Sequence, residues 1–380
     1  MRMLRVLTAA TCLASLALGT GPTPVAVAAS VGAPSPQPTS TSAAAIKVVA
    51  VKTGLATPAA FTFGPSGAIW YVEKGTGKVW VINRRTNHQR LFFDIGQVDS
   101  SGERGGLGIA LHPAWPDQPF VYVYVTRNDH GVLENELLRI RSRNGQGVGF
   151  RVLFRWKVGS ATYHNGGHIS FGPGNKLFIV TGENGDPSNS QDKTNLRGKI
   201  LRINPDGSIP KSNPFGTRIW SFGHRNSFGF AFDPKTGRLW ETENGPECND
   251  EINRIVRGGN FGWGPRETCS GSHPHDTNNS GPRPRHLPKT YFLTPIGITG
   301  AAFCIACGLG GGLGGDLIFG DVNTSSIRAI GLDAARTGLV VGSRRVLLTT
   351  TTGGVFSIQA APDGRIFFSA PNGIYRLAPT

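Results

Sequence analysis

A strand–turn–strand unit with proline in its turn recurs along this chain, and it limits the possible folds more than any other feature. Five copies have their turn prolines at Pro65, Pro113, Pro173, Pro234 and Pro362. The first four prolines are 48 to 61 residues apart, whereas 128 residues separate the last two. This long interval spans two periods, so we predict a hidden copy formed by residues 299–303 and 315–321.

Six such units over residues 46–380 predict an all-β fold, a six-bladed β-propeller. The apolar stretches are short, and no helical period persists beyond about two turns. Radial repetition lets each sheet cover the apolar faces of its neighbours. A β-sandwich is the alternative for repeated Pro-Gly turns, but six phased copies favour the propeller. A functional site is then expected where the loops before the inner strands meet at the central channel.

The first residues have the composition of an export signal. Two arginines precede an apolar run at 6–18, and an A-x-A cleavage site ends at Ala28. The apolar run is too short to cross a bilayer, so we expect no membrane span, although a short anchor is the alternative. We predict a signal peptide at 1–28, a disordered Ser/Pro-rich linker at 29–45 and a secreted propeller domain at 46–380.

The chain is strongly basic, with a formal net charge of +15. Such a surface attracts polyanions, for example acidic polysaccharides or nucleic acid. The basic residues are scattered, however, and no nucleic-acid recognition motif accompanies them. We therefore expect no specific nucleic-acid partner and interpret the charge as mainly diffuse and solubilising.

Four cysteines follow the predicted signal peptide: Cys248, Cys269, Cys304 and Cys307. Export permits disulfides, and the local pairs Cys248–Cys269 and Cys304–Cys307 are preferred among the three possible pairings. A four-cysteine zinc site is the alternative. It would use a C-x2-C spacing at both ends, and only the second pair has that spacing.

Three glycine-rich loops carry the side chains that catalysis would need. Each loop comes just before an inner strand, and together they contain Glu103, His164 and the pair Arg225-Asn226. Glycine lets the backbone approach a ligand, histidine can accept a proton near neutral pH, and arginine can stabilise a developing negative charge. The alternative is a set of tight turns whose polar side chains satisfy local backbone groups.

Five segments in fixed order carry a family resemblance. They are HNGGHI at 164–169, NLRGKILRINPDG at 195–207, GHRN at 223–226, ENGP at 243–246 with DEIN at 250–253, and GNFGW at 259–263. Together they resemble the soluble sugar dehydrogenases that use pyrroloquinoline quinone (PQQ), the glucose/sorbosone dehydrogenase family. The resemblance covers the whole predicted propeller and implies that PQQ and calcium bind at one end of its channel.

The resemblance also implies roles for the residues of the three loops. His164 would remove the proton of the sugar C1 hydroxyl while hydride passes to the quinone. Arg225 would act with it and, together with Asn226, would bind the quinone carbonyls. Glu103 stands at a cofactor-binding position of the first loop, where the family has glutamine. These roles match the chemistry of a base, a cation and a hydrogen-bond donor around a reducible cofactor.

A fourth loop, at 243–252, gathers four acids around a Gly-Pro kink. Carboxylate and carbonyl oxygens are the ligands that calcium prefers. EF-hand spacing is absent, so a hydrated acidic loop is the alternative. The resemblance assigns calcium coordination to the carbonyls of Gly245 and Pro246, with Glu251 supporting the loop.

One part of the family pattern is missing. The family binds the PQQ carboxylates with a lysine and an R-x-R motif, and by register these cations fall on Asn323, Gly354 and Phe356. Losing charge-assisted pairs to three carboxylates should weaken cofactor binding. Arg344 or Arg345 could substitute for the missing cations.

The sequence therefore predicts an exported PQQ-dependent oxidoreductase that oxidises an aldose or a related small sugar. It names neither the sugar, the electron acceptor nor the oligomeric state. One alternative is a non-catalytic propeller that binds carbohydrate or a protein partner, which the missing cations favour. Another is a calcium-dependent hydrolase or lactonase that uses Glu103 and Glu183 at the channel.

Overall fold

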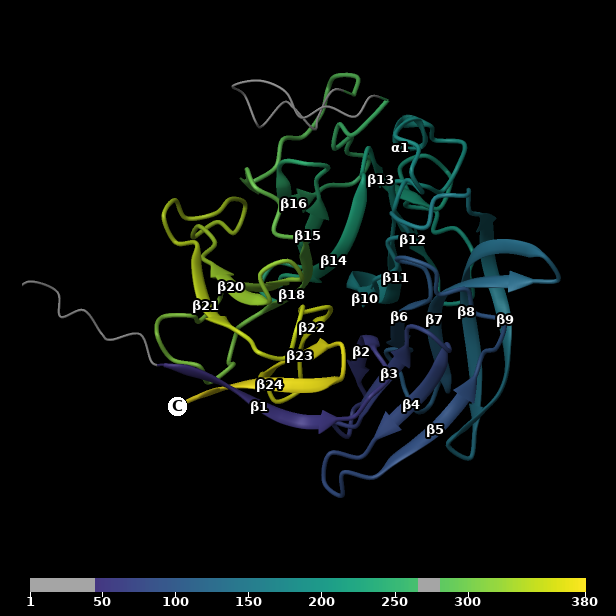
Figure 1. Ribbon diagram of the computed structural model, residues 1–380. Helices are drawn as coiled ribbons and strands as arrows, with labels where there is room; N and C mark the ends of the chain where they lie inside the picture. The colour runs from purple at the N-terminus through teal and green to yellow at the C-terminus, as the bar shows by residue number, and fades with distance from the viewer. Residues whose placement is uncertain (1–44, 266–280) are drawn as a thin grey trace, which may run out of the picture. The chain divides into compact units, whose positions relative to one another are not determined.

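The computed structural model describes residues 45–265 and 281–380, which form six antiparallel sheets of four strands each (Figure 1). The first blade comprises β2 (Pro58–Phe63), β3 (Ile69–Glu73), β4 (Lys78–Ile82) and β5 (Gln89–Asp94). The second comprises β6 (Gly106–Leu111), β7 (Phe120–Asp129), β8 (Val132–Arg143) and β9 (Gln146–Lys157). The third comprises β10 (Ile169–Gly172), β11 (Lys176–Thr181), β12 (Lys199–Ile203) and β13 (Ile219–Phe222).

The remaining blades follow the same pattern. The fourth comprises β14 (Asn226–Phe232), β15 (Leu239–Asn244), β16 (Asp250–Ile255) and β17 (Thr290–Phe292). The fifth comprises β18 (Ile298–Phe303), β19 (Leu317–Asp321), β20 (Ser326–Ile330) and β21 (Arg345–Thr349). The sixth comprises β22 (Ile358–Ala360), β23 (Ile366–Ala370), β24 (Gly373–Pro379) and β1 (Ile46–Thr53). Two short helical segments, η1 (Pro173–Asn175) and α1 (Ser188–Gln191), lie in the third blade's connections.

The repeat found in the sequence corresponds to the first two strands of each blade. Every predicted turn proline follows the first strand of its sheet, from Pro65 after β2 to Pro362 after β22. The hidden copy is the pair β18 and β19, as predicted. Second strands such as β3, β19 and β23 are buried along their whole length, because sheets cover both of their faces.

The blades form a ring through contacts between strands of neighbouring sheets. β2 contacts β6, β6 contacts β10, β14 contacts β18, and β18 contacts β22. Contacts of β11 with β14 and of β2 with β23 link the remaining neighbours. Apolar side chains fill the space between sheets; Phe61 and Tyr71 of the first blade, for example, share a core with Phe367 of the sixth. The predicted six-bladed propeller is confirmed.

The sixth blade is completed by the first described strand. β1 pairs antiparallel with β24, with Ile46 opposite Pro379 and Thr53 opposite Gly373. Ile46 and Val48 pack against the core between the fifth and sixth blades. One sheet therefore holds both ends of the domain (Figure 1). The repeat analysis did not predict this pairing, because β1 comes before the first recognisable copy.

Cys304 and Cys307 form a disulfide, as predicted, so they are not ligands of a four-cysteine zinc site. The other predicted pair involves Cys269, which lies outside the described residues. The predicted signal peptide at 1–28 and all but the last residue of the linker at 29–45 also lie outside them. Within 45–265 and 281–380, no helix has the length and apolar character needed to span a membrane.

Because β1 closes the ring, we expect a charge on its packed face to destabilise the whole domain. Val48→Asp places a carboxylate against the core and should lower the free energy of unfolding by about 2 kcal/mol. Lys47→Asp introduces the same side chain at the neighbouring exposed position and should change stability by less than about 0.5 kcal/mol. Urea denaturation of both variants measures the difference. Equal stability of the two variants would show that the packing of β1 contributes little to the stability of the domain.

Candidate active site

A central cavity of about 310 Å³ lies where the predicted loops meet. All six blades contribute to its wall. Examples from the first to the sixth blade are Lys74, Glu103, His168, Phe228, Val322 and Phe356. The loops before the first strands of the second, third and sixth blades supply Glu103, His168 and Phe356. Of the residues predicted for the site, Glu103 lines this cavity, and the two other predicted loops contribute His168 and Phe228 to it.

His164 is held beside this cavity by a carboxylate. Its Nδ1 lies 2.6 Å from Glu183 Oε1, and both side chains are almost completely buried. His164 has a left-handed backbone (φ 57°), and Asn184 donates to its carbonyl from both the backbone N–H and the side-chain amide at 3.0 Å. These contacts fix the imidazole. Within the described chain no group bonds Nε2, so this nitrogen is available to a ligand.

Glu103 connects the three predicted loops. Its Oε2 accepts hydrogen bonds from the His164 backbone N–H at 2.7 Å and from Asn226 Nδ2 at 3.1 Å. Asn226 Oδ1 in turn accepts from the Gly166 backbone N–H at 3.3 Å. The structure therefore brings Glu103, His164 and Asn226 together, and Glu103 also lines the central cavity.

Arg225 extends toward the acidic loop instead of toward His164. Its guanidinium donates to the carbonyls of Asn244 at 3.2 Å and Gly245 at 2.7 Å, and it lies over the Trp263 ring at 5.3 Å. Gly245 is one of the predicted calcium ligands, and its carbonyl is already bonded to a cation. The donor set in this arrangement does not fit a calcium ion at Gly245, because the guanidinium would repel it.

The other two predicted metal residues, Pro246 and Glu251, do not place several free oxygen atoms around one point. Pro246 is half-buried. Glu251 is buried, and its Oε2 accepts from Asn253 Nδ2 at 3.2 Å. The loop itself is held by Asp250, whose Oδ1 accepts from the Gly245 backbone N–H at 3.0 Å. Calcium stays a prediction of the resemblance.

A buried histidine and two glutamates lie directly behind Arg225. The sequence analysis counted Glu243 among the acids of the fourth loop but assigned no role to His224 or Glu241. His224 Nδ1 lies 2.8 Å from Glu243 Oε2 and 3.8 Å from Glu241 Oε1. The Arg225 backbone N–H donates to the other oxygen of Glu243. The signal was present in the sequence: Glu241 and Glu243 alternate on a second strand, so both point to one buried face.

Burial controls the protonation of this cluster. It lowers the pKa of His224 to about 4, an effect that Glu241 partly opposes. Burial and the charge of Glu243 raise the pKa of Glu241 to about 8. Burial also raises the pKa of Glu243 to about 7, although its hydrogen bond from the Arg225 backbone works against this. Near neutral pH the cluster therefore holds a neutral imidazole and at least one protonated carboxyl.

The predicted substitutes for the missing cations are wrong. Arg344 and Arg345 lie at the outer edge of the fifth blade, where they bond the Tyr291 carbonyl at 2.9 Å and Asp316 at 2.8 Å. The outermost strand of a blade is remote from the axis, so neither arginine reaches the cavity. The register prediction for Phe356 places it correctly at the cavity, where it forms an apolar wall with Val322.

Lys74 is a cation at the cavity that the sequence analysis missed. Its ammonium donates to the carbonyls of Ser100 at 2.9 Å and Gly102 at 2.8 Å. Burial lowers the pKa of Lys74, while the nearby carboxylates of Glu103 and Asp99 raise it. Lys74 directly follows β3, and no sequence motif at this position indicated a functional residue. Lys74 is the one cationic side chain among the described residues of the cavity wall.

Comparison with known proteins connects this arrangement to a family of enzymes. A family model for glucose/sorbosone dehydrogenases matches residues 55–376. Quinoprotein glucose dehydrogenase B from Acinetobacter calcoaceticus is 31% identical over 245 residues, which cover 56% of this chain and 51% of that protein. Aldose sugar dehydrogenase YliI from Escherichia coli K12 is 33% identical over 186 residues, covering 44% of this chain and 48% of that protein. The matches thus span about half the length of these curated relatives.

Solved structures match over a larger share of the chain. The PQQ-bound aldose sugar dehydrogenase from Streptomyces coelicolor has a TM-score of 0.74 at 27% identity, covering 88% of this chain and 97% of that one. A protein from Thermus thermophilus has a TM-score of 0.77 at 29% identity, covering 88% of this chain and all of that one. The propeller described above is therefore also the fold of these proteins.

The buried cluster predicts a pH-dependent stability. Glutamates in the unfolded chain ionise near pH 4.5, whereas Glu241 and Glu243 keep their protons to about pH 8 and 7 in the folded protein. The folded state therefore binds more protons, and the free energy of unfolding should fall by roughly 2 kcal/mol between pH 6.5 and 8. His224 acts in the opposite direction only below pH 6.5, where its lowered pKa destabilises the folded state.

Urea denaturation across this pH range measures the effect. Glu241→Gln removes the carboxyl with the raised pKa, so the free energy of unfolding should fall less between pH 6.5 and 8. Glu247→Gln, at an exposed position of the following loop, should leave it unchanged. A decline of the same size in the Glu241 variant would assign the pH dependence to other groups.

Proposed function

The chain belongs to the glucose/sorbosone dehydrogenase family, and we propose that it is an exported oxidoreductase that oxidises an aldose or a related sugar hydroxyl with PQQ. The pairing of His164 with Glu183 beside the central cavity supports this proposal most directly. Export rests on the predicted signal peptide at 1–28.

His164 is built to act as a general base. Glu183 accepts a hydrogen bond from the Nδ1–H, which leaves the lone pair on Nε2 to receive a proton from a sugar hydroxyl. When the imidazole becomes charged, the carboxylate at 2.6 Å stabilises it. The buried position of both groups keeps this pair in one geometry before the substrate arrives.

The residues beside His164 fit the quinone end of the cofactor. PQQ, when bound, would accept the hydride that leaves the sugar carbon. Asn226 supplies an amide on this side and Lys74 supplies a positive charge at the cavity, whereas the Arg225 guanidinium extends toward the acidic loop. The wall formed by Val322 and Phe356 offers no cation to a carboxylate. The donor set thus supports binding of the quinone carbonyls more strongly than binding of the acid groups.

The hydrolase alternative receives less support from the geometry. It needs carboxylates that are free to act on a substrate. Glu103 Oε2 already accepts two hydrogen bonds, and Glu183 accepts from His164 and, at 3.0 Å, from the Gly185 backbone N–H. Both carboxylates position other groups. The non-catalytic alternative is favoured by the apolar wall at Phe356, and the experiments below separate it from the dehydrogenase.

The central test is sugar-dependent dye reduction by purified protein after titration with PQQ and calcium. His164→Gln should lower kcat by at least roughly a hundredfold, since a positioned base contributes about that much. PQQ binding, followed by the absorbance of the quinone, should persist in this variant. His130→Gln alters a histidine that is 90% exposed and should keep full activity. Absence of quinone binding by the unaltered protein at micromolar PQQ would reject the proposed cofactor.

A second experiment restores a missing cation. Phe356→Arg places a guanidinium in the cavity wall, and it should tighten PQQ binding by at least roughly tenfold through a charge-assisted hydrogen bond. Val341→Arg adds the same charge at a fully exposed loop position, 99% accessible, and should leave the dissociation constant unchanged. If both variants bind PQQ equally, the carboxylates of the cofactor do not face Phe356.

A further inference from the structure

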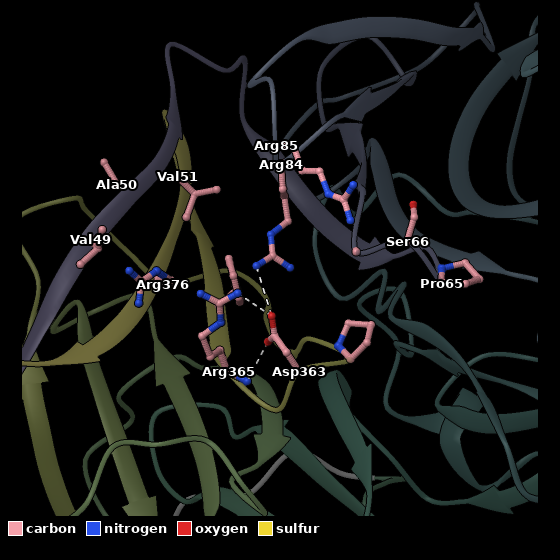
Figure 2. Close-up of a pocket in the computed structure, with 13 residues that line it drawn as sticks. Val49, Ala50, Val51, Pro65, Ser66, Arg84, Arg85, Asp363, Arg365 and Arg376 are labelled. Carbon is pink, nitrogen blue, oxygen red and sulfur yellow. Dashed lines mark hydrogen bonds and ion pairs between the residues drawn. The ribbon is translucent and has the colours of Figure 1, made fainter.

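A second pocket lies between the first and sixth blades, apart from the central cavity (Figure 2). Its volume is about 700 Å³, and it is lined by β1, by strands β23 and β24, and by the turns after β2, β4 and β22. β2 begins at the central cavity and ends at this pocket. Six strand residues span about 20 Å, so the two sites lie at opposite ends of the inner strand.

The charged side chains of this pocket are strongly unbalanced. Four are arginines and one is an acid: Arg84, Arg85, Arg365, Arg376 and Asp363. Two arginines come from the first blade and two from the sixth. They therefore lie on both sides of the boundary between these blades, which we call the seam. A pocket with four guanidinium groups and one carboxylate carries a clear positive charge.

Two of the arginines are held in place by the protein. Arg84 and Arg365 both point toward Asp363 (Figure 2), with N–O distances of 3.4 and 2.5 Å. The Arg84 guanidinium also lies over the Phe367 ring at 4.8 Å and the Phe63 ring at 5.7 Å. Stacking on both blades fixes a planar donor group in the wall of the pocket.

The other two arginines have no such partner. Across the described chain, no carboxylate or carbonyl pairs with the guanidinium of Arg85 or Arg376, although each lines the pocket. Arg376 lies in β24, opposite Val49 of the closing strand. These two groups keep their full capacity to donate bidentate hydrogen bonds to an oxyanion.

We propose that this pocket binds a multivalent oxyanion, a ligand with at least two phosphate, sulfate or carboxylate groups, which bridges the first and sixth blades. One oxyanion group can engage one or two guanidinium groups, and four line the pocket. Its volume admits a ligand of several such groups. Binding across the seam opposes separation of the two blades, so the ligand stabilises the folded ring.

Tripolyphosphate is the probe for this site. Isothermal titration calorimetry at constant ionic strength should give saturable binding with one ligand per chain, and thermal unfolding should shift to higher temperature. Orthophosphate under the same conditions should bind at least roughly tenfold more weakly, because it cannot reach both sides of the seam. A trimer of galacturonate, run in parallel, tells whether carboxylates serve as well as phosphates. Lack of saturable tripolyphosphate binding, or equal affinity for orthophosphate, would overturn the proposal.

The site is assigned by removing the two unpartnered arginines. Arg85→Gln with Arg376→Gln should weaken tripolyphosphate binding at least roughly tenfold and abolish the thermal shift. Unfolding without ligand should stay unchanged, since neither guanidinium pairs with a described group. Arg143→Gln with Arg151→Gln removes the same charge from exposed positions of the second blade. Equal losses in the two double variants would attribute binding to overall charge and refute the pocket.

Discussion

The pairing of β1 with β24 is the constraint on which the rest of the molecule depends. Residues from all six blades line the central cavity, and they meet there only if the ring is closed. Side-by-side packing joins the other blades, but hydrogen bonds between the two ends of the domain complete the last sheet. The candidate active site therefore depends on contacts at the opposite side of the sixth blade.

A histidine–carboxylate pair occurs twice in this architecture, with different surroundings. His164 and Glu183 are 19 residues apart in the third blade, and His224 and Glu243 have the same separation in the fourth. The second imidazole is fully buried, and its Nε2 also bonds Ser221 Oγ at 2.9 Å. The first keeps Nε2 available. The same pair therefore has two uses. In the fourth blade both imidazole nitrogens of His224 have partners inside the protein, whereas in the third blade the Nε2 of His164, unbonded among the described residues, suits it to proton transfer.

Local patterns predicted most of the fold. Proline turns and short apolar strands depend on neighbouring residues, so the period located even the hidden copy at β18 and β19. The closing strand could not be found this way, because its partner is more than 300 residues away in sequence. Arg344 and Arg345 were misplaced because no turn proline marks the repeat of the fifth blade, so the sequence did not show which of its residues approach the axis. Lys74 was missed because blade geometry, and no sequence motif, places it at the cavity.

The geometry of the closing sheet has a mechanical meaning as well. Ile46 lies opposite Pro379, and the backbone N–H of Thr380 donates to the Ala45 carbonyl at 2.8 Å. A force that pulls residues 45 and 380 apart would therefore act on this first hydrogen bond before any other, and the ladder would open pair by pair. Antiparallel strands pulled from the same end separate like a zipper instead of sliding under shear. Tension on residues 45 and 380 would therefore open the ring at low force, beginning with the β1–β24 pairing.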